Sequence, residues 1–101
     1  MAGGSLGMAG APCFAGMGAY RTGVGLVDLV VEEGSRPVVQ TLLPEAIVHT
    51  WESFSEEGAA KACLEKASLV ILGPGLGLKE ESRIFFYQLW NTLKKMPRPL
   101  L

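Results

Sequence analysis

The sequence contains few of the side chains that most catalytic and metal sites use. It has one aspartate, Asp28, one histidine, His49, and two cysteines, Cys13 and Cys63. The cysteines are far apart and lack metal-ligand spacing, so buried reduced thiols are the prediction. No cysteine, aspartate or second histidine lies near His49 in the sequence, which makes metal binding an unfavourable interpretation. No metal site is therefore predicted.

An excess of charge and a long apolar run are also missing. The formal net charge is −1, from 9 basic and 10 acidic residues, so the basic surface of a nucleic-acid-binding protein is absent. No apolar stretch reaches the roughly 20 residues that span a bilayer, and the N-terminus lacks the basic start of a signal peptide. These absences predict a cytoplasmic protein that binds neither nucleic acid nor membrane.

Glycine, in contrast, is abundant, with 13 residues in a chain of 101. One glycine turn, 73–77, follows an apolar run and precedes a long amphipathic segment, and another glycine-rich segment, 3–11, opens the chain. A glycine turn before a helix exposes backbone N–H groups where the helix dipole favours an anion. Two such turns suggest one nucleotide-shaped crevice. The alternative interpretation, that each turn only joins a strand tightly to a helix, carries equal weight.

The apolar pattern predicts alternating strands and helices. Strands are predicted over residues 26–31, 46–51 and 68–72, and helices over residues 11–21, after Ser35, after Ser53 and over residues 80–95. Ser35 is predicted to cap its helix, and Ser53 with Glu56 to form a capping box. In the last helix, the residues predicted to face inward are Phe86, Leu89, Trp90 and Leu93.

This alternation is typical of an α/β fold with a mostly parallel sheet and helices on its faces. Ligands of such sheets bind beyond the carboxyl ends of the strands, where the turn at 73–77 would lie. No strand precedes the first glycine segment, and residues 98–101 resemble the entry to a further strand. Both ends are therefore expected to be cut relative to a larger domain, and the exposed sheet edges predict a homo-oligomer.

Several segments resemble, in order and spacing, the ADP/ATP-dependent NAD(P)H-hydrate dehydratases. They are Gly3-Gly4-Ser5, Gly10-Ala11, residues 20–27, Pro44-Glu45 before Ile47-Val48, and residues 70–77. The resemblance implies a ribokinase-like three-layer fold, with residues 1–101 as the substrate-side part of the dehydratase domain. It also implies dehydration of (6S)-NAD(P)H hydrate at the expense of ADP or ATP, by phosphoryl transfer to the hydrate hydroxyl and elimination.

The resemblance further implies which residues lie at the site. Substrate-binding positions fall on Ala11, Gly73, Gly75 and Gly77, and a possible substrate-side loop contains Gly4, Ser5 and Gly10. The implied ligands are hydrated NADH or NADPH and ADP or ATP, the nucleotide together with Mg²⁺. The family's nucleotide loop and its catalytic aspartate have no counterpart in these 101 residues. No catalytic residue is therefore predicted in the chain, and the chain alone is expected to be inactive.

Two other functions remain open at this point: a small-molecule kinase of the same broad fold, and a binding module without catalysis. For Asp28, a hydrogen-bonded or strand-edge role is favoured over a catalytic one. Glu45 is assigned equally to a substrate contact and to a structural role in the turn. Arg21 is interpreted as a solvated helix end.

Overall fold

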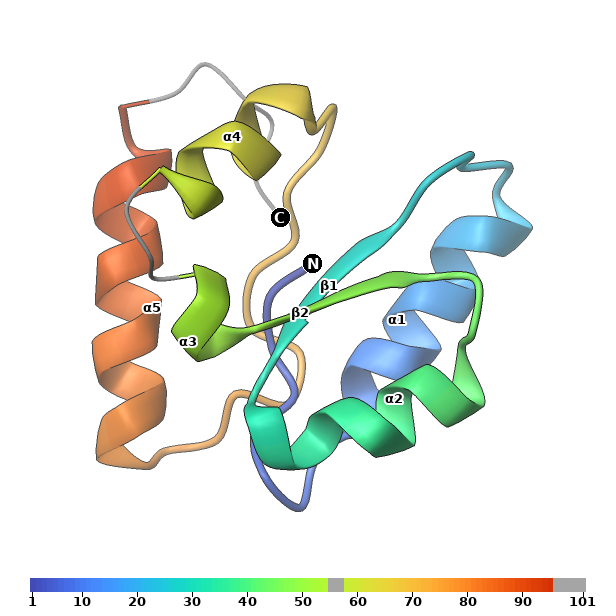
Figure 1. Cartoon of the computed structure of the whole chain (residues 1–101), viewed down its shortest axis with the longest axis horizontal. Helices are drawn as coiled ribbons and strands as arrows, with labels where there is room; N and C mark the ends of the chain where they lie inside the picture. The colour runs from blue at the N-terminus through green and yellow to red at the C-terminus, as the bar shows by residue number, and fades with distance from the viewer. Residues whose placement is uncertain (55–57, 96–101) are drawn as a thin grey trace.

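The computed structural model describes residues 1–54 and 58–95, which form three layers (Figure 1). The elements are α1 (Gly10–Arg21), β1 (Asp28–Val31), the 3-10 helix η1 (Glu33–Ser35), α2 (Arg36–Leu42), β2 (Ile47–Thr50), α3 (Trp51–Phe54), α4 (Ala59–Lys66) and α5 (Glu80–Leu93). Helices α1 and α2 cover one face of the strands, and α3, α4 and α5 lie on the other. The predicted α/β alternation is confirmed.

The sheet is parallel, and the N-terminal residues extend it. Strand β1 pairs with β2 in a register that aligns Asp28 with Ile47 and Val31 with Thr50. Ala2 forms parallel bridges to Val30 on one side and to Leu72 on the other. As expected, no strand leads into the first glycine segment, but residues 1–3 run between β1 and the segment before the second glycine turn, and the isolated bridges of Ala2 place them in the sheet.

The predicted strand over residues 68–72 is only partly formed. Val70 and Leu72 make isolated bridges rather than a continuous ladder. Around Ala2, the Ala2 amide donates to the Ile71 carbonyl at 2.8 Å, and the Gly73 amide donates to the Ala2 carbonyl at 3.0 Å. This short pairing still aligns the two glycine segments, because each begins directly after the residues that pair.

Alternate residues of β1 enter two separate cores, as the strand period of two requires. Leu29 and Val31 pack with Val39 and Leu43 on the side of α1 and α2. On that side, a Cβ at Gly16 would lie 2.5 Å from Leu43 Cδ2, so this glycine permits the close helix packing that the small residues of α1 predict. On the other face, the core contains Val30, Trp51, Phe54, Leu64, Phe85, Leu89 and Leu93.

Helix α5 is rotated relative to the prediction. Its buried residues include Phe85, Leu89 and Leu93, whereas Trp90 is 40% exposed, so the inward assignment of Trp90 is wrong. The Phe85 ring stacks on Trp51 with centroids 4.8 Å apart and planes 9° apart. Because Trp51 belongs to α3, a contact distant in sequence sets this rotation.

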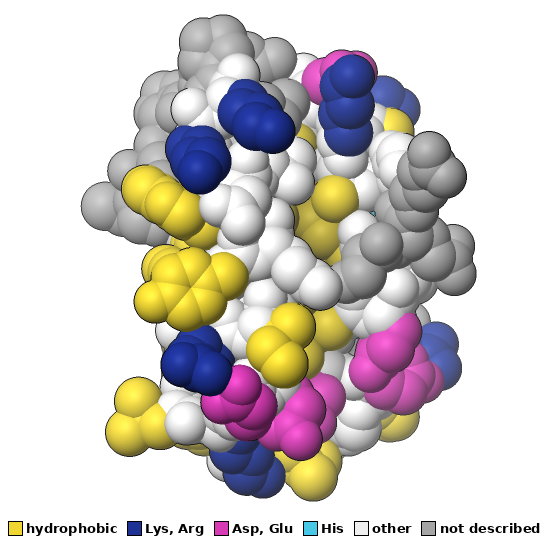
Figure 2. All heavy atoms as spheres, turned by 90° about the vertical axis from the view of Figure 1, so that its left-hand side faces the viewer, with side chains coloured by type: hydrophobic (Ala, Val, Ile, Leu, Met, Phe, Trp, Pro, Cys, Tyr) yellow, Lys and Arg dark blue, Asp and Glu magenta, His cyan; other side chains and the backbone are white. Residues whose placement is uncertain are grey.

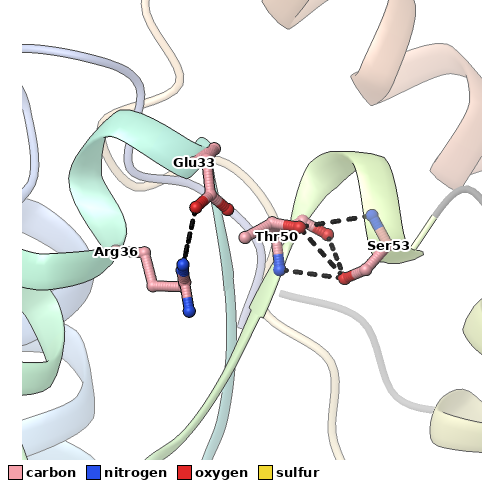
Figure 3. Close-up of polar contacts among 4 residues, drawn as sticks. All are labelled: Glu33, Arg36, Thr50 and Ser53. Carbon is pink, nitrogen blue, oxygen red and sulfur yellow. Dashed lines mark hydrogen bonds and ion pairs between the residues drawn. The ribbon is translucent and has the colours of Figure 1, made fainter.

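Helix α3 has a capping box, but three residues earlier than predicted (Figure 3). The Ser53 amide donates to Thr50 Oγ1 at 3.2 Å, and the Thr50 amide donates to Ser53 Oγ at 3.2 Å. Ser53 therefore completes the box that Thr50 begins, and the predicted partner Glu56 lies outside the described residues. Ser35 precedes α2 without a side-chain cap, because its hydroxyl donates to the Ser5 carbonyl instead.

We expect the 101-residue chain to associate in solution. Apolar side chains remain exposed along α5 and before it, among them Leu78, Ile84, Tyr87 and Trp90, and Figure 2 shows apolar side chains grouped on this face. Such a patch favours association. Sedimentation velocity should show dimers or larger species at micromolar concentration, and a monomer across the whole concentration range would contradict this.

None of the described helices combines the length and apolar character needed to cross a bilayer.

Candidate functional site at the two glycine turns

The two glycine segments are joined directly by backbone hydrogen bonds. The Gly4 amide donates to the Pro74 carbonyl at 2.9 Å, and the Ser5 amide donates to the Gly75 carbonyl at 2.8 Å. The Ser5 hydroxyl donates to the same Gly75 carbonyl at 2.8 Å. The structure therefore brings together the turns that the sequence analysis assigned to one crevice, although about 70 residues separate them.

The joined turns lie at the carboxyl ends of the strands, where α/β sheets bind ligands. The Glu32 amide, directly after β1, donates to the Gly4 carbonyl at 3.2 Å. The indole Nε1 of Trp51, directly after β2, donates to the Gly3 carbonyl at 3.2 Å. The sequence analysis placed Trp51 at the end of a predicted strand, and nothing in the local pattern indicated that it would support this site.

Packing against protein atoms explains the glycine at position 75. Gly75 has a φ of +68°, and a Cβ there would lie 2.7 Å from the Met8 carbonyl oxygen and 3.0 Å from the Ala11 Cβ. Ala11 and Gly75 therefore contact each other rather than face each other across an open cavity. Gly75 is needed by the fold whether or not a ligand binds nearby.

Gly4, Ser5 and Gly77 also form part of this packed junction. A Cβ at Gly4 would lie 2.8 Å from Val31 Cγ1, and one at Gly77 would lie 2.6 Å from Met8 Cε and 3.2 Å from Ser5 Oγ. Ser5 is buried, and its hydroxyl already binds the Gly75 carbonyl. These residues hold the two turns in place, and their contact with substrate stays a prediction.

Gly10 and Gly73 face open space. The nearest atom to a Cβ at Gly10 would be Phe14 Cε2 at 3.8 Å, and a Cβ at Gly73 would meet no atom within 4 Å. Gly73 has a φ of +129°, which favours glycine in any case. Of the seven predicted site residues, Gly10 and Gly73 are therefore the two glycines beside which the described structure leaves room.

Of the two helices that follow the glycine segments, α1 has the N-terminus better suited to an anion. Its first turn has no acidic residue and no side-chain cap. Helix α5, to which the sequence analysis applied the same anion argument after the turn at 73–77, carries Glu80 and Glu81 in its first turn. Arg83 pairs with Glu80 at 2.6 Å. Two carboxylates at this end oppose an anion, so the dipole argument applies to α1 rather than α5.

Charged side chains near the strand ends are already paired. Arg36 and Glu33, which follow β1, form an exposed ion pair at 2.7 Å (Figure 3). The Glu32 carboxylate accepts the Leu6 amide, which ties the first glycine segment to the end of β1. Backbone amides, rather than unpaired cationic side chains, are therefore what this part of the site offers to a phosphate.

A hollow of about 220 Å³ lies beside the second turn, and the sequence analysis did not identify it. Its lining residues are Leu76, Gly77, Leu78, Lys79, Ser82, Arg83, Phe86 and Tyr87. This volume is below the ~300–1,000 Å³ of typical ligand pockets, so the hollow cannot enclose a dinucleotide by itself.

Three candidate residues lie away from the joined turns. Asp28 begins β1 and Glu45 precedes β2, so both lie at the amino ends of the strands. Asp28 Oδ1 and His49 Nε2 are hydrogen-bonded at 3.0 Å, in agreement with the hydrogen-bonded role predicted for Asp28. Arg21 lies at the exposed C-terminal end of α1. Glu45 therefore has a place in the turn before β2 and none at the glycine junction.

Comparison with known proteins identifies the family. A family model described as NAD(P)H-hydrate dehydratase matches residues 1–97. The chain belongs to this family. It is 34% identical over 99 residues to the ATP-dependent (S)-NAD(P)H-hydrate dehydratase of Ixodes scapularis, covering 98% of the chain and 31% of the relative. It is 36% identical over 75 residues to the ADP-dependent (S)-NAD(P)H-hydrate dehydratase of Streptococcus pneumoniae, covering 74% of the chain and 25% of the relative.

The fold is ribokinase-like. The crystal structure of a ribokinase-like superfamily protein from Enterococcus faecalis superposes with a TM-score of 0.80 and 23% sequence identity, over 98% of the chain and 34% of that protein. The chain thus spans about a third or less of the length of these relatives. The described residues correspond to one part of the family's domain.

Proposed function

We propose that this chain forms the hydrate-binding part of an enzyme that dehydrates (6S)-NAD(P)H hydrate to NAD(P)H at the expense of ADP or ATP. One structural observation carries the proposal beyond family membership. The two glycine segments, 3–11 and 73–77, are hydrogen-bonded to each other at the carboxyl ends of β1 and β2. Within a chain of this family, that junction is the place where a dinucleotide can approach bare backbone.

The chemistry of the junction suits a phosphate and an apolar ring. Backbone N–H groups at the start of α1 provide hydrogen-bond donors, and the helix dipole favours negative charge there. Leu6 and Met8, which are 56% and 42% exposed in the first glycine segment, provide apolar surface beside these donors. We propose that the phosphates of the hydrate lie over Gly10 and Ala11 and that Gly73 permits the approach of the rest of the substrate.

ADP or ATP enters the proposal as a co-substrate, and Mg²⁺ would accompany it. ADP or ATP supplies the phosphoryl group that converts the hydrate hydroxyl into a leaving group. Among residues 1–54 and 58–95, no group of three ligating side chains gathers at the two turns. The Glu32 carboxylate already accepts the Leu6 amide. The described residues therefore do not fit a Mg²⁺ site, and we derive no step through the ion.

The remaining parts of the proposal follow from the family and the surface. The proposed location is the cytoplasm, and the proposed assembly is a homo-oligomer without nucleic-acid or membrane partners. The kinase alternative loses support because the curated relatives above are named as dehydratases. A binding module without catalysis stays compatible with the chain.

Hydrate binding can be tested at Gly10, where a larger side chain fits the fold but would occupy the proposed phosphate position. A Cβ there has no neighbour closer than 3.8 Å. We expect hydrated NADH to bind the 101-residue chain in ligand-observed NMR, and Gly10→Val to weaken this binding at least about 10-fold, equivalent to about 1.4 kcal/mol. The reason is that the valine would displace a phosphate from the N-terminus of α1.

Gly18→Val is the matched control for this experiment. Gly18 lies on the same helix, and a Cβ there would meet nothing within 4 Å. Both variants add the same side chain to α1 without a close contact, so a selective loss in Gly10→Val reports on the site. Failure of the wild-type chain to bind hydrated NADH would overturn the proposal. Equal binding by the two variants would show that the entry of α1 does not hold the substrate.

A further inference from the structure

Three potential metal ligands converge on the sheet face opposite α1 and α2. They are Asp28 from β1, His49 from β2 and Cys63 from α4, and one ligand atom from each lies within 4.8 Å of the other two. Asp28 Oδ1 and His49 Nε2 are 3.0 Å apart. The group is independent of the glycine junction, because Asp28 is at the amino end of β1 and the junction is at its carboxyl end.

The three donors together suit a borderline or soft divalent transition metal. Thiolate, imidazole and carboxylate are the donors that Zn²⁺ accepts, at bond lengths of about 2.0–2.3 Å. Donor atoms around a tetrahedral ion of this size are roughly 3.3–3.8 Å apart. Side-chain adjustments of about 1 Å would therefore bring the three atoms from their present separations to a coordination sphere, with no change in the strands or in α4.

The surroundings allow an ion to enter and complete its coordination. The side chains of His49 and Asp28 are 32% and 38% exposed, and Cys63 is half-buried, so solvent reaches the group and can supply a fourth ligand. Burial raises the pKa of the Cys63 thiol, and the Asp28 carboxylate raises it further, while the Met1 ammonium and Lys66 act in the opposite direction. The thiol is thus protonated without metal, and coordination would release its proton to solvent.

We propose that Asp28, His49 and Cys63 form a binding site for one divalent transition metal ion of the Zn²⁺ class, separate from the hydrate site. The ion would replace the hydrogen bond between Asp28 and His49 with one bond to each. It would also link both strands to α4, whose only buried residue is Leu64. The role that follows from this position is structural, since the site is remote from the glycine junction.

Cobalt titration of the reduced chain tests this site, because Co²⁺ bound to a thiolate has a charge-transfer absorption band that hydrated Co²⁺ lacks. We expect a saturable band at one equivalent of Co²⁺, which added Zn²⁺ abolishes. Cys63→Ser should abolish the band. His49→Gln and Asp28→Asn should each raise the dissociation constant at least about 10–100-fold, the loss typical of even outer-sphere changes at metal sites.

Cys13→Ser is the matched control. Cys13 is buried in the other core, among Val27, Leu29 and Val39, so its loss should leave the titration unchanged. Far-UV circular dichroism would establish that each variant retains its helices, and His49→Gln keeps the test decisive if Cys63→Ser does not fold. The proposal would be overturned by the absence of a saturable band, by a band that persists in Cys63→Ser, or by an unchanged dissociation constant in both His49→Gln and Asp28→Asn.

Discussion

The 101-residue chain by itself is expected to convert no hydrated NADH to NADH in the presence of ADP or ATP. Its sequence has no counterpart of the family's nucleotide loop or catalytic aspartate, and its one aspartate, Asp28, lies at the amino end of β1, remote from the glycine junction. Loss of a general base alone lowers rates by roughly 10²–10⁴-fold, and loss of nucleotide positioning lowers them further. The measurement is recovery of the nicotinamide absorbance from purified (6S)-NADH hydrate.

The Streptococcus pneumoniae relative, assayed with ADP, is the positive control for this experiment. Turnover by the purified chain would contradict the prediction if it disappeared in Gly10→Val, because a contaminating enzyme would not respond to that variant. Hydrate binding without turnover is the expected combination. It would assign substrate recognition to these residues and the phosphoryl-transfer step to residues that this sequence does not contain.

The second large effect is expected for Gly75→Val, which should lower the melting temperature of the chain by more than about 10 °C or prevent folding. Position 75 has a φ of +68°, which costs a β-branched residue about 1–3 kcal/mol. A Cβ there would also lie 2.7 Å from the Met8 carbonyl oxygen, and such overpacking costs about another 1–3 kcal/mol. In a domain of this size, about 1 kcal/mol shifts the melting temperature by roughly 4–8 °C.

Gly23→Val separates these two contributions. Gly23 has a φ of +98°, but a Cβ there would meet no atom within 4 Å. Gly23→Val therefore introduces backbone strain without a collision, and it should lower the melting temperature by clearly less than Gly75→Val. Equal shifts in thermal unfolding followed by circular dichroism would refute the packing role of Gly75. An unchanged melting temperature in Gly75→Val together with lost hydrate binding would instead assign this glycine to the ligand.

Local pattern was sufficient for the order of most elements, but it missed the short helices η1 and α3 and predicted a strand over residues 68–72 that is only partly formed. The apolar residues before and within β1 (Asp28–Val31) predicted a buried strand, and the spacing of apolar residues predicted α4 and α5. Glycine content and order also predicted the two turns, and the resemblance of several motifs to known dehydratases predicted the family. These features depend on residues close together in sequence, since strand and helix periods and the permitted backbone of glycine are local properties.

The tertiary structure decided everything that depends on distant residues. Stacking of Phe85 on Trp51 sets the rotation of α5, and pairing on both sides of Ala2 aligns the glycine segments. Contacts between the segments determine that Gly75 is packed whereas Gly10 faces open space. The same folding places Cys63 beside Asp28 and His49, although 35 residues separate it from Asp28 and 14 from His49. No local pattern contains such contacts, because they form only when the sheet and its helices have packed together.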